Sequence, residues 1–344
     1  MHKISLGQTG LSVSAVGFGG IPIQRLSEQK AIEVVGRCLE LGVTFLDTAN
    51  GYTTSEERIG KAIAGRREGL VLATKTQARD ATGVAQHLAL SLERLGVKTI
   101  DLYQFHCVSS NEDYEKVIAS GGPLDFVREA RASGQVNHIG LTSHSLEIAL
   151  RAVRSGYFET IMFPFNFIAN EAAQELIPLV LERDVGFIAM KPLAGGALDN
   201  ASLAFKYLRQ FPQILPIPGV ERAEEMEEIV AIMNGPAALT SEEQAAMERM
   251  RSELGNRFCR RCGYCEPCLQ DVSIQALMIM DSIIKRMPAD IVFPDLAETV
   301  DQAGECTECG ECEEKCPYGL PIREMIQEHV DLYHRERAQA GLAQ

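Results

Sequence analysis

The sequence predicts an α/β fold, a (β/α)₈ TIM barrel, followed by a small, mostly helical domain that is rich in cysteine. Two observations lead to this prediction. Short β-branched or aromatic runs alternate with amphipathic stretches before residue 255, as they do in repeated βαβ units. Eight of the ten cysteines then lie within residues 259–316. We therefore expect a barrel domain over residues 1–254 and a cysteine-rich domain over residues 255–344.

Eight strands are expected in the first domain. The runs that predict them begin near Ser14, Val43, Leu70, Thr99, Val136, Thr160, Phe187 and Ile214. Several runs, such as VLATK and GFIAM, are almost continuously apolar, which is typical of parallel strands covered on both faces. Glycines, for example Gly42, Gly96 and Gly186, are expected to close the intervening helices in the left-handed conformation.

The same alternation also fits an open, doubly wound sheet. Such a sheet usually carries a G-x-G-x-x-G sequence after its first strand, whereas here Gly17-Phe18-Gly19-Gly20 is followed by Ile-Pro. Polar residues instead follow several strands, namely Asp47, Lys75, His106, Ser143 and Asn166. A barrel gathers the carboxyl ends of its strands at one rim, where its active site lies. The closed barrel is therefore favoured.

The composition is that of a globular enzyme, with 46% hydrophobic and 23% charged residues. A net charge of −14 disfavours binding to the phosphates of nucleic acid. No apolar run approaches the roughly 18 residues of a membrane span, and the first residues, MHKISLGQTG, lack the apolar segment of a secretory signal. We expect a cytoplasmic protein with reduced thiols that binds neither nucleic acid nor membrane.

Four residues near the strand ends form a plausible acid–base set: Asp47, Tyr52, Lys75 and His106. A free tyrosine has a pKa near ~10, and a neighbouring ammonium would lower that pKa and make Tyr52 a usable general acid. Asp47 could supply the counter-ion that a buried Lys75 needs, and His106 could orient a carbonyl oxygen. Taken singly, each residue is more simply interpreted as an ordinary loop or strand-end residue; their occurrence on successive strands favours a site.

These residues lie in segments that resemble the aldo-keto reductase family over roughly residues 1–235. The segments are TGLSVSAVGFGG, DTA-x-x-Y-x-x-SE from Asp47 to Glu56, ATK ending at Lys75, DLYQFH ending at His106, IGLTSHS and IPGV. The resemblance implies NADP- or NAD-linked reduction of a small-molecule carbonyl, or oxidation of an alcohol, with Tyr52 as proton donor and Asp47, Lys75 and His106 completing a catalytic tetrad. It also implies a nucleotide site formed by Gly20, Asp47, Ser143, His144, Lys191, Leu193, Gly195, Gly219 and Arg222.

Departures from the family pattern concern the cofactor site. Met162 and Met190 stand where a glutamine and an aromatic residue usually hold the nicotinamide. At the adenosine end, Arg222 is the only basic residue of the run from Glu221 to Glu225, and the neighbouring carboxylates would repel a 2′-phosphate. We therefore expect weak discrimination between NADH and NADPH.

The cysteines of the second domain form two runs. They are Cys259-x₂-Cys262-x₂-Cys265-x₂-Cys268 and Cys306-x₂-Cys309-x₂-Cys312-x₃-Cys316-Pro317. The second run has the bacterial ferredoxin spacing, in which the fourth cysteine serves the other cluster. We therefore expect two 4Fe–4S clusters, one held by Cys259, Cys262, Cys265 and Cys316, the other by Cys306, Cys309, Cys312 and Cys268. Zinc is the alternative, but it usually takes two cysteine pairs separated by a loop.

Helices are expected over residues 272–287 and 321–335, so the second domain resembles a helical ferredoxin-type domain. The whole chain resembles the aldo-keto reductase subgroup with such a fused 4Fe–4S domain, which implies electron transfer to or from a redox partner protein. Because a hydride carries two electrons and a 4Fe–4S cluster normally accepts one, the clusters either work with a flavin or a substrate radical, or are mainly structural; electron transfer is favoured. The alternative is a non-catalytic, nucleotide-binding redox sensor with structural clusters.

Overall fold

The computed structural model describes residues 1–342. It divides into two compact units, Met1–Glu243 and a C-terminal unit that begins at Gln244. The division falls in the first turn of helix α10 (Ser241–Leu254), earlier than the division after residue 254 that the composition indicates, because the cysteines begin only beyond this helix. None of the helices over the described residues combines the length and apolar character needed to cross a membrane.

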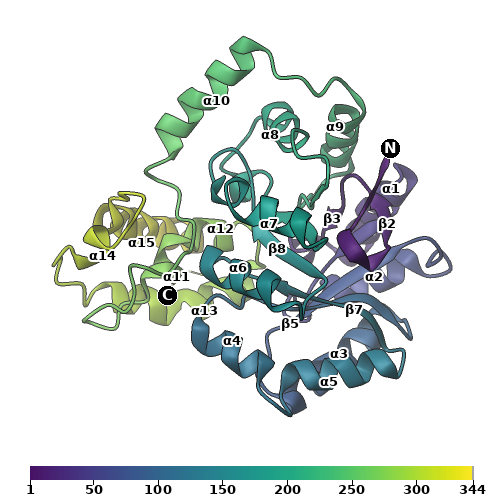
Figure 1. Cartoon of the computed structure of the whole chain (residues 1–344). Helices are drawn as coiled ribbons and strands as arrows, with labels where there is room; N and C mark the ends of the chain where they lie inside the picture. Colours follow the sequence, from purple (N-terminus) through teal and green to yellow (C-terminus); the bar gives the residue numbers. More distant parts are fainter. Residues whose placement is uncertain (343–344) are drawn as a thin grey trace. The chain divides into compact units, whose positions relative to one another are not determined.

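Eight parallel strands form the sheet of the first unit and pair in chain order (Figure 1). They are β3 (Phe18–Gly19), β4 (Phe45–Asp47), β5 (Val71–Thr76), β6 (Ile100–Phe105), β7 (Val136–Thr142), β8 (Thr160–Pro164), β9 (Gly186–Met190) and β10 (Ile214–Pro216). Backbone hydrogen bonds from Gly17 N to Pro216 O (2.9 Å) and from Gly19 N to Pro218 O (2.8 Å) join the first strand to the last. The sheet therefore closes, and the predicted (β/α)₈ barrel is confirmed.

The glycine-rich segment before α1 serves this closure. A Cβ atom on Gly19 would lie 2.9 Å from Ile217 O, and one on Gly20 would lie 2.8 Å from Asp47 O. Since real Cβ atoms do not approach a carbonyl oxygen so closely, only glycine lets β3 lie against its neighbours on both sides. Close packing of strands is thus sufficient to explain these glycines.

Helices alternate with the barrel strands and cover the outside of the sheet (Figure 1). They are α1 (Glu28–Glu40), α2 (Ser55–Ile63), α3 (Ala81–Leu95), α4 (Asn111–Ile118), α5 (Pro123–Ala132), α6 (Leu146–Ser155), α7 (Leu176–Glu182), α8 (Ala201–Leu208) and α9 (Ala223–Asn234). Gly96 closes α3 in the left-handed conformation, as expected. Gly186 does not close α7: Asp184 is the left-handed residue there (φ +53°), and Gly186 begins β9.

A hairpin that the sequence did not predict covers the amino-terminal end of the barrel. Its strands, β1 (Lys3–Ser5) and β2 (Ser12–Ser14), pair antiparallel, so the run near Ser14 belongs to the hairpin and the first barrel strand begins at Phe18. Leu6 and Val13 of the hairpin pack with inward-facing residues of the barrel such as Phe45. Apolar side chains fill this end of the barrel. The polar residues that follow the carboxyl ends of the strands lie at the opposite rim.

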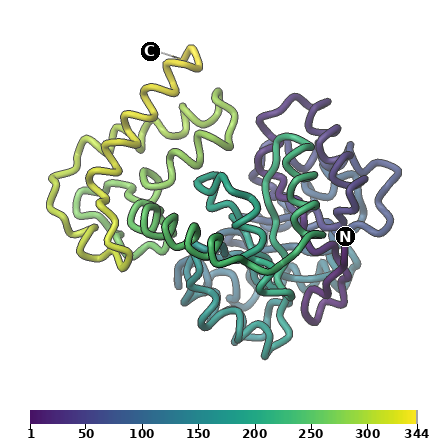
Figure 2. Tube along the Cα trace, turned by 90° about the horizontal axis from the view of Figure 1, so that it is seen from above, coloured from purple at the N-terminus to yellow at the C-terminus, as the bar shows by residue number. Residues whose placement is uncertain are grey.

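The C-terminal unit is helical. Its helices are α11 (Ile274–Met278), α12 (Met280–Ile284), α13 (Ala289–Ala303), α14 (Glu311–Glu314) and α15 (Ile322–Gln339). The helix expected over residues 272–287 is broken at Ile279 into α11 and α12, whereas α15 confirms the helix expected over residues 321–335. Helix α13, which contains Pro294, was not predicted; it lies beside α15 (Figure 2), where Tyr333 Oη donates to Phe293 O at 2.9 Å.

Candidate active site and cysteine cavities

Lys75 is the centre of the polar rim. It lies on β5 with only 1% of its surface exposed. Its ammonium donates to Asp47 Oδ2 at 2.7 Å and to Thr48 O at 2.6 Å. The second carboxylate oxygen, Asp47 Oδ1, accepts a hydrogen bond from Gln104 Nε2 at 3.2 Å. Both charges of this buried ion pair therefore have several partners, as a buried pair requires.

Tyr52 and His106 complete the same cluster. Tyr52 lies in the loop between β4 and α2, and its ring centroid is 4.9 Å from Lys75 Nζ. His106, directly after β6, meets the tyrosine ring edge-on, with centroids 5.6 Å apart and an angle of 80° between the planes. The structure thus brings together all four residues of the predicted tetrad from the ends of three neighbouring strands.

The protonation of Tyr52 differs from the expectation drawn from sequence. Burial raises the pKa of Tyr52, and the positive charge of Lys75 offsets this effect only in part, so the expected lowering is wrong. Burial alone would lower the pKa of Lys75, but Asp47 and Tyr52 outweigh it and raise that pKa. At neutral pH the structure therefore pairs a neutral phenol, which carries its proton, with a permanent ammonium.

Polar contacts fix the loop that carries Tyr52. Ser55 Oγ donates to Gly20 O at 2.8 Å and accepts from Thr48 Oγ1 at 2.9 Å. The carboxylate of Glu56, 1% exposed, accepts from Thr74 Oγ1 at 2.6 Å and from Arg94 Nη1 at 3.4 Å. The serine and glutamate of the DTA-x-x-Y-x-x-SE segment thus hold the tyrosine loop against strands β3, β4 and β5.

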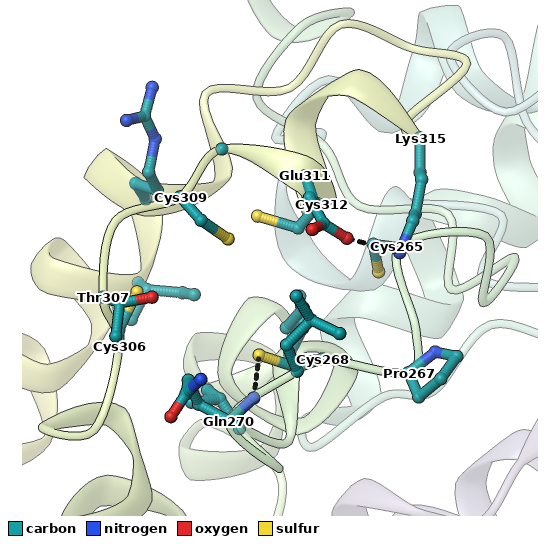
Figure 3. Close-up of a pocket in the computed structure, with 16 residues that line it drawn as sticks. Cys265, Pro267, Cys268, Gln270, Cys306, Thr307, Cys309, Glu311, Cys312 and Lys315 are labelled. Carbon is teal, nitrogen blue, oxygen red and sulfur yellow. Dashed lines mark hydrogen bonds and ion pairs between the residues drawn. The ribbon is translucent and has the colours of Figure 1, made fainter.

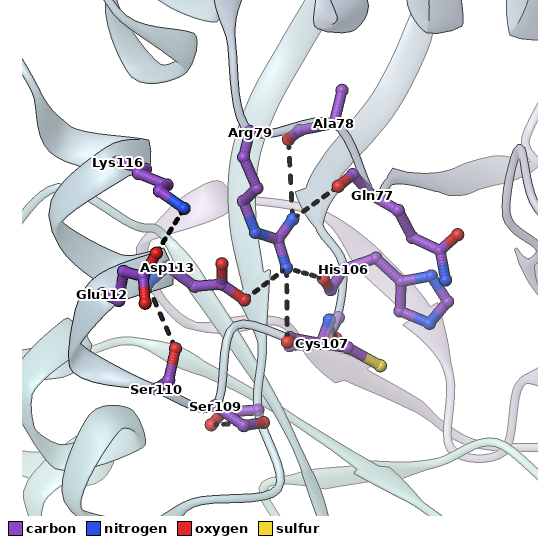
Figure 4. Close-up of polar contacts among 12 residues, drawn as sticks. Gln77, Ala78, Arg79, His106, Cys107, Ser109, Ser110, Glu112, Asp113 and Lys116 are labelled. Carbon is purple, nitrogen blue, oxygen red and sulfur yellow. Dashed lines mark hydrogen bonds and ion pairs between the residues drawn. The ribbon is translucent and has the colours of Figure 1, made fainter. Parts of the chain in front are cut away.

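Arg79 fixes the loop that carries His106 (Figure 4). Its guanidinium donates to His106 O at 2.8 Å, to Cys107 O at 3.3 Å and to Asp113 Oδ2 at 3.3 Å. It also donates to Gln77 O at 3.0 Å, in the loop that follows β5. Since Cys107 has a left-handed backbone (φ +54°), which a non-glycine residue rarely adopts, these contacts hold a strained turn in place.

The expected nucleotide residues follow the later strands around the rim. Ser143 and His144 come directly after β7 and are buried; Ser143 Oγ accepts from Ser145 N at 3.0 Å, and His144 N donates to Ser109 Oγ at 2.9 Å. Lys191 and Leu193 come after β9, followed by Gly195. Gly219 forms an isolated parallel bridge with Gly19 at the closure of the barrel.

Two local features bear on what this part of the rim can bind. In the loop after β9, Lys191, Ala194, Gly195 and Gly196 all have positive φ values, between +47° and +97°. A turn of this kind can gather backbone N–H groups into an anion-binding concavity, but the amides of Ala194 and Gly196 already donate to Lys191 O at 2.9 Å and to Leu193 O at 2.8 Å. At the start of α9, however, Glu225 accepts from Glu221 N at 2.8 Å and from Arg222 N at 3.2 Å. Its carboxylate already occupies the amides that an anion there would use.

Sequence reasoning missed three residues that position the tetrad. Gln104, Thr48 and Arg79 each contact a tetrad residue, as described above. Gln104 could have been found, because it lies two residues before His106 and so shares its face of the strand. Arg79 could not, because it lies in the loop after β5 and contacts residues that follow β6, a contact that only the folded structure shows.

Two cavities in the C-terminal unit are lined by the cysteines. The first cavity is lined by Cys259, Cys262, Cys265 and Cys316. The second cavity is lined by Cys268, Cys306, Cys309 and Cys312, and also by Cys265. In Figure 3 the thiols of the second run face the loop of Cys268 across this space. Each cysteine run therefore contributes its last member to the cavity of the other run.

The cavities are formed by two loops of the same backbone shape, the first cysteine loop (259–265) and the second cysteine loop (306–312). In each, the residue before the middle cysteine and the glycine after it are left-handed: Arg261 (φ +62°) and Gly263 (φ +86°), then Glu308 (φ +56°) and Gly310 (φ +84°). This shape bends three cysteines around one centre. It fits the ferredoxin-type spacing, in which thiolates wrap a cubane cluster.

Among the described residues, no group of three or more His, Cys, Asp or Glu side chains has the geometry to hold one metal ion. Burial raises the pKa of the Cys265 thiol to about 12, so binding of iron must displace its proton. Cys38 is buried within α1 and Cys107 lies at the barrel rim, and neither lines the two cavities.

Comparisons with known proteins agree with this geometry. The model of the aldo/keto reductase family matches residues 15–204, and the model of a 4Fe-4S dicluster domain matches residues 258–321. The chain is 30% identical over 215 residues to an L-galactose dehydrogenase of Arabidopsis thaliana, covering 57% of this chain and 66% of that protein. It is 28% identical over 221 residues to an aldo-keto reductase of Bacillus subtilis (strain 168), covering 58% and 64%. The matches thus span about two thirds of these relatives.

Solved structures match the barrel. An aldo-keto reductase from Bacillus halodurans (holo form) superposes with a TM-score of 0.64 at 24% identity, covering 73% of this chain and 96% of that one. An aldo-keto reductase from Klebsiella pneumoniae in complex with NADPH gives a TM-score of 0.63 at 20% identity, covering 73% and 95%. At these identities the likeness establishes the fold. With a family model that spans more than half of its length, the chain belongs to the aldo/keto reductase family of NAD(P)-dependent oxidoreductases and carries a 4Fe–4S dicluster domain at its C-terminal end.

Proposed function

We propose that the chain interconverts a small-molecule carbonyl and its alcohol at Tyr52, with NADP or NAD as hydride carrier, and that two 4Fe–4S clusters exchange electrons with a redox partner protein. The observation that carries the catalytic part is the placement of Lys75. Its buried ammonium lies between the Asp47 carboxylate (2.7 Å) and the ring of Tyr52 (4.9 Å to the centroid). A redox sensor without chemistry has no need of an ammonium beside a tyrosine.

Tyr52 acts as the proton donor in carbonyl reduction. Because burial raises its pKa, the phenol holds its proton until the carbonyl oxygen gains negative charge. The ammonium of Lys75 stabilises the phenolate as the proton leaves, which is the usual function of a charge placed where a transition state develops charge. Asp47 keeps Lys75 charged, and the ring of His106, edge-on to Tyr52, limits where the carbonyl oxygen can lie.

The nucleotide would bind along Gly20, Asp47, Ser143, His144, Lys191, Leu193, Gly195, Gly219 and Arg222. When bound, its nicotinamide supplies or accepts the hydride. The turn after β9, in which Lys191, Ala194, Gly195 and Gly196 have positive φ values, would hold the diphosphate through amides other than those of Ala194 and Gly196. Two similar structures, both from Klebsiella pneumoniae, were solved with NADP and with NADPH. Since the Glu225 carboxylate occupies the amides of Glu221 and Arg222, we expect no strong preference for the 2′-phosphate of NADPH.

Replacement of Tyr52 by phenylalanine tests the catalytic proposal. Tyr52→Phe should reduce turnover of a carbonyl panel by roughly 10²–10⁴-fold while leaving nucleotide binding nearly unchanged. Tyr157→Phe, at an exposed tyrosine of the barrel, is the matched control and should keep full turnover. Equal turnover in Tyr52→Phe and wild type would contradict the proposal, and a wild type without any turnover would favour the non-catalytic redox sensor.

The clusters would be held by Cys259, Cys262, Cys265 and Cys316 in the first cavity, and by Cys306, Cys309, Cys312 and Cys268 in the second. Two observations support this fit: the donor sets are all thiol, and the glycines Gly263 and Gly310 adopt the left-handed conformation that each loop needs. We expect about eight irons and eight sulfides per chain in anaerobically purified protein. Four irons, or zinc, would contradict the two-cluster proposal.

Mixing the anaerobic protein with NADH or NADPH tests whether the barrel and the C-terminal unit exchange electrons. Because a hydride delivers an electron pair, we expect electron paramagnetic resonance signals of reduced clusters when NADH or NADPH is added with a flavin, which splits the pair. Signals at catalytic rates would support an electron-transfer role. Clusters that stay oxidised with nicotinamide alone and with added flavin, while carbonyl turnover proceeds, would contradict it.

A further inference from the structure

The two cysteine loops share one backbone shape but carry opposite charges. Arg261 and Glu308 occupy the same position, the left-handed residue before the middle cysteine. The first cysteine loop contains Arg260 and Arg261 and no acidic residue, whereas the second contains Glu308 and Glu311 and no basic residue. The loops therefore differ by four unit charges.

The charged side chains that line the two cavities also differ. Among the residues that line the first cavity, Arg260 and Arg261 are the charged ones. The second cavity is lined by Glu311, Lys315 and Arg323, and its two basic residues are engaged with carboxylates.

The engaged pairs are Lys315 with Glu311 at 3.3 Å and Arg323 with Glu313 at 2.8 Å. Glu313 has a counterpart in the first run, Glu266, at the same position after the third cysteine, so these two carboxylates do not distinguish the sites. At the first cavity, Arg260 donates to the carbonyl oxygens of Gly255 (3.0 Å) and Phe258 (3.1 Å), whereas the basic residues of the second cavity pair with carboxylates.

Arg261 also offers a hydrogen bond to a bound group. Its Nε atom is buried and has no hydrogen-bond partner within residues 1–342, although its side chain lines the first cavity. A buried donor without a partner is costly. A cluster sulfur in this cavity would satisfy it, and Glu308 cannot make the corresponding donation in the second cavity.

Reduction adds one electron, and so one negative charge, to a bound 4Fe–4S core. The potential of that step depends on the net charge and the hydrogen bonds around the cluster. We propose that the cluster held by Cys259, Cys262, Cys265 and Cys316 has the higher reduction potential of the two, so that an electron entering the C-terminal unit comes to rest there. This inference rests on the proposed pair of clusters. Water around the exposed Cys309 acts in the opposite direction, but it concerns one thiolate, whereas the surroundings of the two cavities differ by two charges once Glu266 and the Lys315–Glu311 and Arg323–Glu313 pairs are included.

A potentiometric titration of the anaerobically purified full chain tests the proposal. Iron and sulfide are counted first, and dithionite then supplies electrons while electron paramagnetic resonance follows each cluster. We expect two one-electron steps. Arg261→Gln should move only the step at higher potential, downward, whereas Glu308→Gln should move only the step at lower potential, upward.

Two further variants separate charge from other effects. Arg261→Lys keeps the charge and should leave the upper step close to that of wild type. Arg335→Gln is the control, because Arg335 is exposed and lies about 18 Å along α15 from Arg323, beyond the Debye length of about 10 Å at 0.1 M salt. It should move neither step.

The failures of the two proposals are distinguishable. Four irons, or zinc, in the wild type would contradict the pair of clusters itself. Eight irons with an Arg261→Gln variant that moves the lower step, or neither step, would overturn the assignment of potentials and leave the clusters in place. An Arg261→Lys variant that behaves like Arg261→Gln would overturn the role of charge.

Discussion

At the rim of the barrel, the buried charges of Lys75 and Asp47 find their partners within the chain, whereas the thiols of the C-terminal unit face cavities. Lys75 donates to Asp47, and Asp47 also accepts a hydrogen bond from Gln104. The eight cysteines instead line the two cavities. The difference teaches that the ion pair of the candidate active site is balanced once the barrel folds, while the proposed cluster sites of the C-terminal unit are filled only by what they bind.

Packing supports the same contrast. The inside of the barrel is filled by apolar residues from the strands and the N-terminal hairpin, including Leu6, Phe45 and Leu215. In the C-terminal unit, six of the eight cysteines pack directly against the apolar core around Leu277 and Phe293. Because the core of this unit borders its ligand sites, loss of a ligand group should disturb the fold there and not in the barrel.

The largest effect is expected at a shared cysteine. Cys268→Ser removes a thiol that lies in the first run but lines the second cavity, so we expect the second cluster to be lost outright and the first to be weakened with the surrounding core. The iron and sulfide contents should each fall from about eight to at most four per chain. Cys107→Ser, outside both cavities, is the matched control and should keep all of the iron. A Cys268→Ser variant that still holds eight irons would contradict the assignment of Cys268 to the second cluster.

The next effect concerns the ion pair under Tyr52. Lys75→Met leaves the buried carboxylate of Asp47 without its counter-charge, which should reduce the free energy of unfolding by about 3–5 kcal/mol. It also removes the charge that lowers the pKa of Tyr52, so alcohol oxidation, which needs the phenolate, should require a higher pH than in wild type. Thermal unfolding and pH–rate profiles measure the two effects.

Lys61→Met serves as the control for Lys75→Met, because Lys61 forms an exposed ion pair with Glu28 and such pairs contribute little. A Lys75→Met variant with the stability and pH profile of Lys61→Met would show that the rim does not depend on its internal partners.

A smaller effect is expected from Arg79, a positioning residue. Arg79→Gln removes the hydrogen bonds to His106 O and Cys107 O, and displacement of His106 should lower kcat by roughly 10–100-fold with little change in nucleotide affinity. Arg79→Lys should restore part of kcat, since it keeps one donor near these carbonyls. If KM for the nucleotide rises while kcat is unchanged, the residue does not act through His106.

The smallest effect concerns the nucleotide. Glu225→Gln removes one half-buried negative charge beside the exposed Arg222 (3.0 Å), so the affinity for NADPH relative to NADH should rise by less than about tenfold. Glu227→Gln, on the same helix and paired with Arg37, is the control. Titration of both nucleotides against each variant measures the ratio; a wild type that already prefers NADPH by three orders of magnitude would contradict this view of the site.

Much of the barrel could be predicted because its strands are buried on both faces and read as apolar runs. The hairpin β1–β2 could not, since its strands, KIS and SVS, each contain a single apolar residue and form no apolar run. Helix α13 was missed because Pro294 lies within it, and the break at Ile279 depends on packing in the small unit. The gathering of Asp47, Tyr52, Lys75 and His106 followed from their places near strand ends.

The electrostatics of the sites were less accessible from sequence. The direction of the Tyr52 pKa depends on burial, which a sequence does not give, so the expected lowering was wrong. The grouping of Cys316 with the first run and Cys268 with the second followed from spacing. The opposite charges of Arg261 and Glu308 are visible in the sequence, but their equivalence becomes clear only from the shared left-handed backbone.

Removal of iron tests the contrast between the two units most directly. A chelator applied to the reduced, full-length protein would be followed by hydrogen exchange of each unit and by carbonyl turnover with NADPH. We predict that amides of residues 255–342 lose their protection, while residues 1–243 stay protected, nucleotide still binds, and turnover persists. A C-terminal unit that stays protected without iron, or a barrel that loses turnover and protection together with the iron, would contradict the account.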